Sequence, residues 1–167
     1  MRKIVIAIFL TSIITTPTFG QLITTCETEE SDGQTVTRCS MVRILEIEEQ
    51  PDQRSQRIRR GRVGLYQADS QVFMRLRTMS VVPNFAKVDT ATLQIDSKSY
   101  SVPLRVSSQM RDTRRPSFER TEATLDKDHL EAVGRADTLR LEAGQAVFLL
   151  PVGELGEHAN VLLEQEE

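Results

Sequence analysis

The sequence predicts an all-β, mainly antiparallel fold: a β-sandwich or barrel of about eight or nine short strands with one or two short helices. Short runs that alternate apolar and polar residues recur along the chain, and turn-forming pairs separate them. The chain has 167 residues, of which 39% are hydrophobic and 27% charged, as is typical of a folded domain.

The first twenty residues have the pattern of a signal peptide. A short positive head at residues 1–3 precedes an apolar run at 4–14, and the small residues Thr18 and Gly20 favour cleavage after Gly20. Eleven apolar residues are fewer than the roughly 20 that a membrane-spanning helix needs. We therefore expect residues 1–20 to be removed, and 21–167 to form one β-sandwich-like domain, without an integral membrane segment, in the bacterial periplasm or outside the cell.

The mature chain is predicted to begin with a disulfide-linked hairpin. Asp32 and Gly33 form a strong two-residue turn signal, and a turn there sets Cys26 directly opposite Cys39. Counted outward from the turn, this pair is of the non-hydrogen-bonded type, in which side chains approach closely. An exported pair of cysteines is normally oxidised, so a structural disulfide is expected. A redox dithiol or metal site is disfavoured, since there is no Cys-x-x-Cys spacing and no histidine cluster.

The pattern in the central part of the chain predicts strands that pair in hairpins. The alternating run 41–47 is expected to extend the second strand of the cysteine hairpin, and residues 54–62 to form a basic loop or frayed edge. Two hairpins follow, 63–68 with 72–79 and 88–95 with 100–106. Because Pro103 has no backbone N–H, its strand is expected to be an edge strand or to contain a bulge.

The last third of the sequence combines strands with helices. A second basic loop at 111–116 leads to a strand near 118–124, and Asp126 is a favourable N-cap for the clearest helix. A final hairpin is expected from Leu139 to Leu150, followed by a short helix over 153–163. Its core-facing residues are expected to be Leu155, Ala159 and Leu162 or Leu163.

The sequence offers little catalytic chemistry, and we predict a non-enzymatic protein with no catalytic residues, cofactor or metal. It has no nucleophile elbow, phosphate-binding glycine loop or zinc-protease helix. Asp126, Asp128 and His129 could hold a metal, but capping explains the aspartates and a solvated first turn explains His129. His158 lies in an acidic segment and is expected at the surface. Carboxylate pairs dispersed in the sequence leave a small hydrolase open.

Arginines are concentrated in the two predicted basic loops, although the chain carries a net charge of −3. A solvated loop balanced by nearby acids is one interpretation, and an anion- or partner-binding face is the other. Nucleic acid is disfavoured as a partner because the protein is acidic overall and the loops lack aromatic residues. The candidate binding residues are Arg54, Arg57, Arg59, Arg60, Arg62, Arg111, Arg114 and Arg115.

Several segments resemble the invasion-associated locus B family of exported bacterial envelope proteins. The resemblance rests on the early cysteine hairpin, residues 72–77 leading into 82–83, residues 91–96, the helix at 125–130, and residues 149–152. The tryptophan and second cysteine pair typical of that family are missing here. The resemblance implies a β-sandwich and an envelope location, and no catalytic residues.

Three functions fit the sequence. The first is an exported binding or interaction module of the periplasm or envelope, with a protein or anionic envelope component as its partner. The second is a module that recognises an acidic glycan or lipid headgroup through its arginines, and the third is the small hydrolase. The sequence leaves the oligomeric state open.

Overall fold

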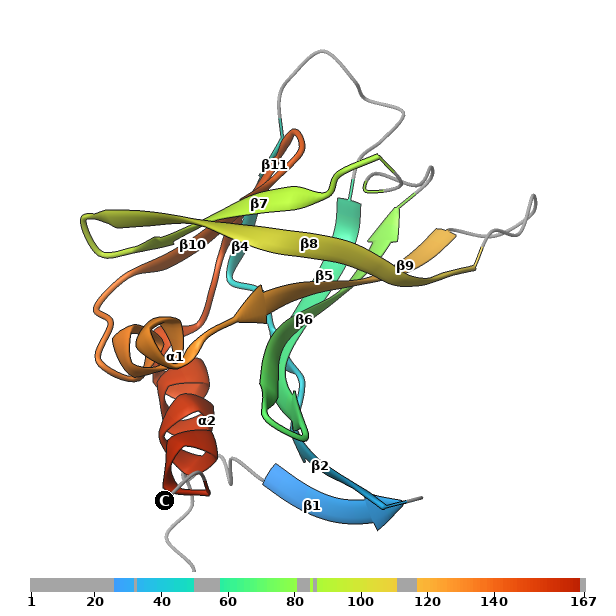
Figure 1. Cartoon of the computed structure of the whole chain (residues 1–167). Coiled ribbons are helices and arrows are strands. Elements are labelled where there is room, and N and C mark those ends of the chain that lie inside the picture. The colour runs from blue at the N-terminus through green and yellow to red at the C-terminus, as the bar shows by residue number, and fades with distance from the viewer. Residues whose placement is uncertain are drawn as a thin grey trace, which may run out of the picture.

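The computed structural model describes residues 26–31, 33–49, 58–80, 85, 87–110 and 117–165, and the predicted signal peptide lies outside them. Figure 1 shows two crossing layers of strands with both helices at one end. In chain order the elements are β1 (Cys26–Ser31), β2 (Gln34–Cys39), β3 (Val42–Arg43), β4 (Glu46–Glu49), β5 (Ile58–Ala68), β6 (Gln71–Ser80), β7 (Thr90–Ile95), β8 (Lys98–Met110), β9 (Ser117–Leu125), α1 (Lys127–Gly134), β10 (Leu139–Ala143), β11 (Ala146–Leu149) and α2 (Val152–Glu164).

All strand pairs are antiparallel, which confirms the predicted all-β, sandwich-like class. The strand order is β1-β2-β5-β6-β9-β8-β7-β10-β11-β4, with β3 also paired to β5. The long strand β8 belongs to both layers, because its first half pairs with β7 and its second half with β9. The described part of the chain contains eleven strands, more than the eight or nine predicted.

The prediction that residues 41–47 extend the second strand of the cysteine hairpin holds for Val42 and Arg43, which continue along the same neighbour, and is wrong for the residues after them. Like β2 before it, Val42 pairs with β5, opposite Val63 and one residue out of register with the pairing of β2. The chain then changes partner within two residues, since Ile44 N–H donates to the Gly61 carbonyl and Leu45 N–H to the Leu149 carbonyl. Residues 42–49 therefore link β5 in one layer to β11 in the other.

Pro103 lies at an edge of the layer that contains β7, as predicted, because residues 98–103 of β8 pair only with β7 among the described strands. Pro103 is the last residue of β8 that pairs with β7, and pairing with β9 begins at Leu104. A residue without an N–H is accommodated where the strand passes from one layer to the other. The predicted alternative, a bulge, is found farther along β8, between Val106 and Ser108.

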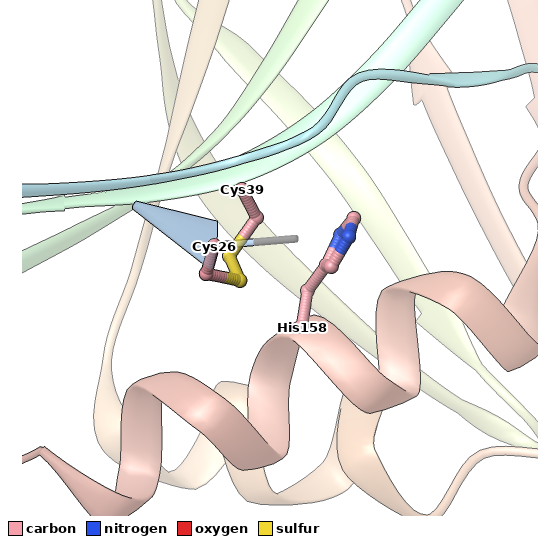
Figure 2. Close-up of side chains that lie close together, drawn as sticks. All are labelled: Cys26, Cys39 and His158. Atoms are coloured by element: carbon pink, nitrogen blue, oxygen red, sulfur yellow. A yellow bond between two sulfur atoms is a disulfide. The ribbon is translucent and has the colours of Figure 1, made fainter. Parts of the chain in front are cut away.

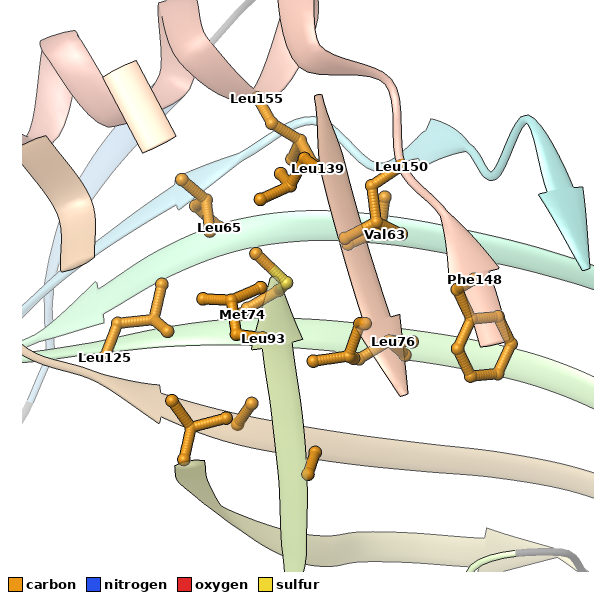
Figure 3. Packing of buried hydrophobic residues seen from close by; sticks show 14 of the residues in the cluster. Val63, Leu65, Met74, Leu76, Leu93, Leu125, Leu139, Phe148, Leu150 and Leu155 are labelled. Carbon is orange, nitrogen blue, oxygen red and sulfur yellow. The ribbon is translucent and has the colours of Figure 1, made fainter. Parts of the chain in front are cut away.

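One hydrophobic core lies between the layers and the helices (Figure 3). The predicted alternation in β6 is confirmed, since Val72, Met74 and Leu76 are buried in this core. The final helix also has the predicted face, with Leu155, Ala159 and Leu162 buried. Within the described ranges, no helix is long and apolar enough to cross a membrane.

The helix α1 begins at the predicted N-cap. The Asp126 side chain accepts the backbone N–H of His129 at 2.9 Å, and His129 Nδ1 accepts the N–H of Asp126 at 3.3 Å. These reciprocal bonds form a capping box. The expectation that His129 is simply solvated is wrong, because its ring packs edge-on against Tyr100 with centroids 4.7 Å apart.

Candidate functional site

Four arginines form a row across the layer that contains β3, β5, β6 and β9, on the face opposite the core. We call them the arginine row. Strand pairing places Arg43 of β3 opposite Arg62 of β5, Arg62 opposite Arg77 of β6, and Arg77 opposite Arg120 of β9. Residues directly opposite in an antiparallel sheet point to the same side. Neighbouring strands are about 4.8 Å apart, so the row is about 14 Å long.

The arginine row has no compensating acid among the residues that the structure describes. None of its four members forms an ion pair there, and three of them, Arg43, Arg62 and Arg77, are exposed. The Nε atom of Arg120 is buried without a hydrogen-bond partner. Like charges directly opposite in a sheet are destabilising. An anion lying along the row would relieve this repulsion.

The next row of side chains is held together by a buried carboxylate. Glu122 of β9 is only 2% exposed and lies between Arg75 of β6 and Arg105 of β8. Each arginine donates from Nε and Nη2 to one carboxylate oxygen, with separations of 2.8 to 3.0 Å. Burial by itself would raise the pKa of Glu122, but hydrogen bonds from Arg75, Tyr66 and Arg105 hold it below its usual value.

Aromatic rings fix these two arginines in place. Tyr66 and Phe73 stack with centroids 4.9 Å apart, and the Arg75 guanidinium lies 3.9 Å from the centre of the Tyr66 ring. Arg105 lies 5.0 Å from the centre of the Phe73 ring. Cation–π contacts of this kind restrict arginine side chains.

The two rows together present six arginines against one carboxylate, although the whole chain has a net charge of −3.

Two further features border the arginine row. On the side away from Glu122, Phe118 points outward with 49% of its surface exposed. At the β3 end, the described residues leave a cleft of about 600 Å³ between residues 43–47 and 58–62. The arginines that line this cleft are Arg43, Arg59, Arg60 and Arg62.

The structure places the predicted arginines as follows. Arg59, Arg60 and Arg62 are brought together on strand β5, so for these three the loop predicted as one alternative is wrong. The other predicted residues, Arg54, Arg57, Arg111, Arg114 and Arg115, lie outside the described residues. Ile58 and Ser117, the described residues that follow these two segments in the sequence, lie at the same end of the sheet, because Ile58 pairs with Ser80, and Ser80 with Ser117.

Sequence reasoning missed Arg43, Arg77 and Arg120 as members of a site. A partial signal was present, since alternation places Arg75 and Arg77 on the face of β6 opposite the core. The rest depends on register between strands that are far apart in the sequence, which composition does not reveal.

The second candidate site is the predicted disulfide. Cys26 and Cys39 are bonded and lie opposite each other with Cα atoms 3.9 Å apart, and Ser31 lies opposite Gln34 as the turn predicts. On the same face of the hairpin, the Thr37 hydroxyl donates to Gln165 Oε1 at 2.7 Å. The hairpin is thus attached to the end of α2.

The expectation that His158 is at the surface is wrong, and this one histidine lies beside the two cysteines. His158 is fully buried on α2, and an imidazole nitrogen and both sulfur atoms lie within 4.8 Å of one another (Figure 2). Neither ring nitrogen has a hydrogen-bond partner among the residues that the structure describes. Burial lowers the pKa of His158, and Glu157 and Glu154 offset part of this effect.

Removal of the disulfide should lower stability without abolishing the fold. A crosslink between residues 13 apart restricts the unfolded chain, and its loss should reduce the free energy of unfolding by about 3 kcal/mol. We expect the double variant Cys26→Ser/Cys39→Ser to show this loss in urea unfolding. Unchanged stability would mean that the hairpin contributes nothing to the cooperative unit, and ligand binding at the arginine row should be unaffected.

Comparison with models of protein families, with curated proteins and with solved structures finds no match to this chain.

Proposed function

We propose that the protein is an exported, non-enzymatic binding module that recognises an acidic polysaccharide through the arginine row. The observation that carries this proposal is the register of Arg43, Arg62, Arg77 and Arg120, which aligns four guanidinium groups that form no ion pair with any described residue. Export and the resemblance to the invasion-associated locus B family remain predictions from the sequence, and the disulfide is compatible with export.

The chemistry of the row favours a ligand with several carboxylate or sulfate groups. A guanidinium group donates two parallel hydrogen bonds to a planar anionic group, which an ammonium group cannot do. Four such groups at the spacing of β-strands present a line of charge about 14 Å long. An extended polymer meets this line better than a single small anion does.

A membrane surface is the weaker candidate for this face. Interfacial binding scales with the apolar area inserted among lipids. In the described ranges, only Leu45 and Phe118 are large exposed hydrophobic residues. One exposed ring beside the row offers a flat apolar surface to a sugar ring but little insertion into a bilayer.

The test compares two triple charge reversals in the full chain. In the first variant Arg43, Arg62 and Arg77 are each changed to Glu; in the control, the exposed residues Lys98, Lys127 and Arg135 are changed to Glu. Both variants change the net charge equally. Calorimetry with heparin and with polygalacturonate should show at least tenfold weaker binding for the first variant only, about 1.4 kcal/mol.

Two further measurements test the proposal: binding at increasing salt concentration, and binding to lipid vesicles compared with binding to the polysaccharides. Binding of the unmodified protein should weaken as salt rises. Equal affinities of the two triple variants, or binding to phosphatidylglycerol vesicles without binding to either polysaccharide, would contradict the proposal.

A further inference from the structure

We propose that Cys26, Cys39 and His158 form a zinc site when the disulfide is reduced. This inference is independent of the function proposed for the arginine row, because it concerns other elements. The three side chains lie between the β1–β2 hairpin and the helix α2. The inference follows from three ligand-bearing side chains that come from three separate elements, β1, β2 and α2.

The geometry already gathers the three ligand atoms. Both sulfur atoms and one imidazole nitrogen lie within 4.8 Å of one another. Figure 2 shows the His158 side chain extending from α2 beside the disulfide. In a tetrahedral site with Zn–S bonds of about 2.3 Å, two sulfur ligands are about 3.8 Å apart. The movement needed after reduction is therefore small.

The state of His158 is the second, independent observation. A buried polar group without a hydrogen-bond partner destabilises a folded protein. His158 is fully buried and its ring nitrogens have no partner in the described part of the chain, so the folded state retains an unfavourable group here. The neutral imidazole is the form that binds metals. A metal ion between the ring and the sulfur atoms would satisfy one of its nitrogens.

The surroundings hold the ligands close to one another. Besides the Thr37 bond, Gln165 Nε2 donates to the Thr28 hydroxyl at 3.3 Å, so two side-chain contacts join the end of α2 to the hairpin. His158 and Gln165 are seven residues apart, which places them on one face of the helix. These contacts do not involve the sulfur atoms, so we expect the hairpin and α2 to remain adjacent after reduction.

The reaction needs a dithiol reductant. The reductant gives two electrons and two protons to the Cys26–Cys39 bond, which becomes two thiols while the reductant becomes a disulfide. Zinc then displaces the two thiol protons and binds two thiolates and the neutral imidazole. Two soft sulfur ligands and one nitrogen suit zinc, and water completes the tetrahedron.

The test measures metal binding to the full chain in both redox states. After anaerobic reduction and removal of the reductant, titration with Zn²⁺ should show one ion per chain, and Co²⁺ should give a thiolate charge-transfer absorption. The oxidised protein should give neither signal. Reduced His158→Gln should bind zinc at least tenfold more weakly, whereas His129→Gln, which changes the other histidine, should bind as the unmodified protein does.

Several results would overturn the site. They are the absence of one-to-one binding after reduction, equal binding by His158→Gln, and equal binding by Cys26→Ser/Cys39→Ser. If reduction unfolds the chain, far-ultraviolet circular dichroism provides the answer: recovery of β-structure on adding zinc supports the site, and its failure contradicts it.

Discussion

Replacing Glu122 by leucine should lower the free energy of unfolding by about 4 kcal/mol, because removing one partner of a buried ion pair leaves the other charge uncompensated. The variant leaves Arg75 and Arg105 facing each other beside the arginine row, with no acceptor between them. Chemical unfolding at neutral pH measures the loss. Glu122→Gln should lose less, since its amide oxygen still accepts one hydrogen bond.

Glu29→Gln is the matched control for this prediction. Its ion pair with Arg38 is exposed on both sides, so the change should stay within about 0.5 kcal/mol. The pH dependence provides a second check. Because the pKa of Glu122 is lowered in the folded state, its stabilisation is present above the unfolded value near 4.5 and is lost as the pH falls through the folded value. The leucine variant should lack this acid-dependent loss.

Phe148→Ala should reduce the free energy of unfolding by about 3 to 5 kcal/mol, because it leaves a cavity where a large buried ring was. Phe148 is fully buried in β11, opposite Ile47 of β4 and Leu141 of β10, and its ring is 6.1 Å from that of Phe85. Its loss weakens the contact between residues 42–49 and the rest of the core. Thermal and urea unfolding both measure the effect.

Val147→Ala, one position earlier, is the control because Val147 points to the other face of the same strand and is only half-buried. We expect it to lose less than half as much stability. Similar losses for the two variants would contradict the assignment of Phe148 to the core.

The sequence was sufficient for most elements because each has one face against the core. In β6, alternation identified Val72, Met74 and Leu76 as buried, and a shift by one residue would expose all three. It failed at residues 44–47, where the alternation continues but the strand changes partner at Leu45. Periodicity tells which face a residue occupies, but it does not tell which strand lies beside it.

The candidate sites were less predictable for the same reason. Arg77 and Arg120 are 43 residues apart and meet only through the register of β6 with β9. The burial of His158 could have been predicted, because it follows Leu155 by three residues on the helix face assigned to the core. The acidic residues Glu154 and Glu157 beside it favoured a surface position instead.

The linking role of residues 42–49 has a consequence for folding kinetics. Hairpins such as β5–β6 and β10–β11 join neighbours in sequence, whereas Ile47 pairs with Phe148, about a hundred residues away. Contacts between distant parts of a chain form only after much conformational entropy has been lost. We therefore expect the hairpins to form early and β4 to join β11 late, so that folding takes milliseconds to seconds and the rate-limiting step is this last pairing.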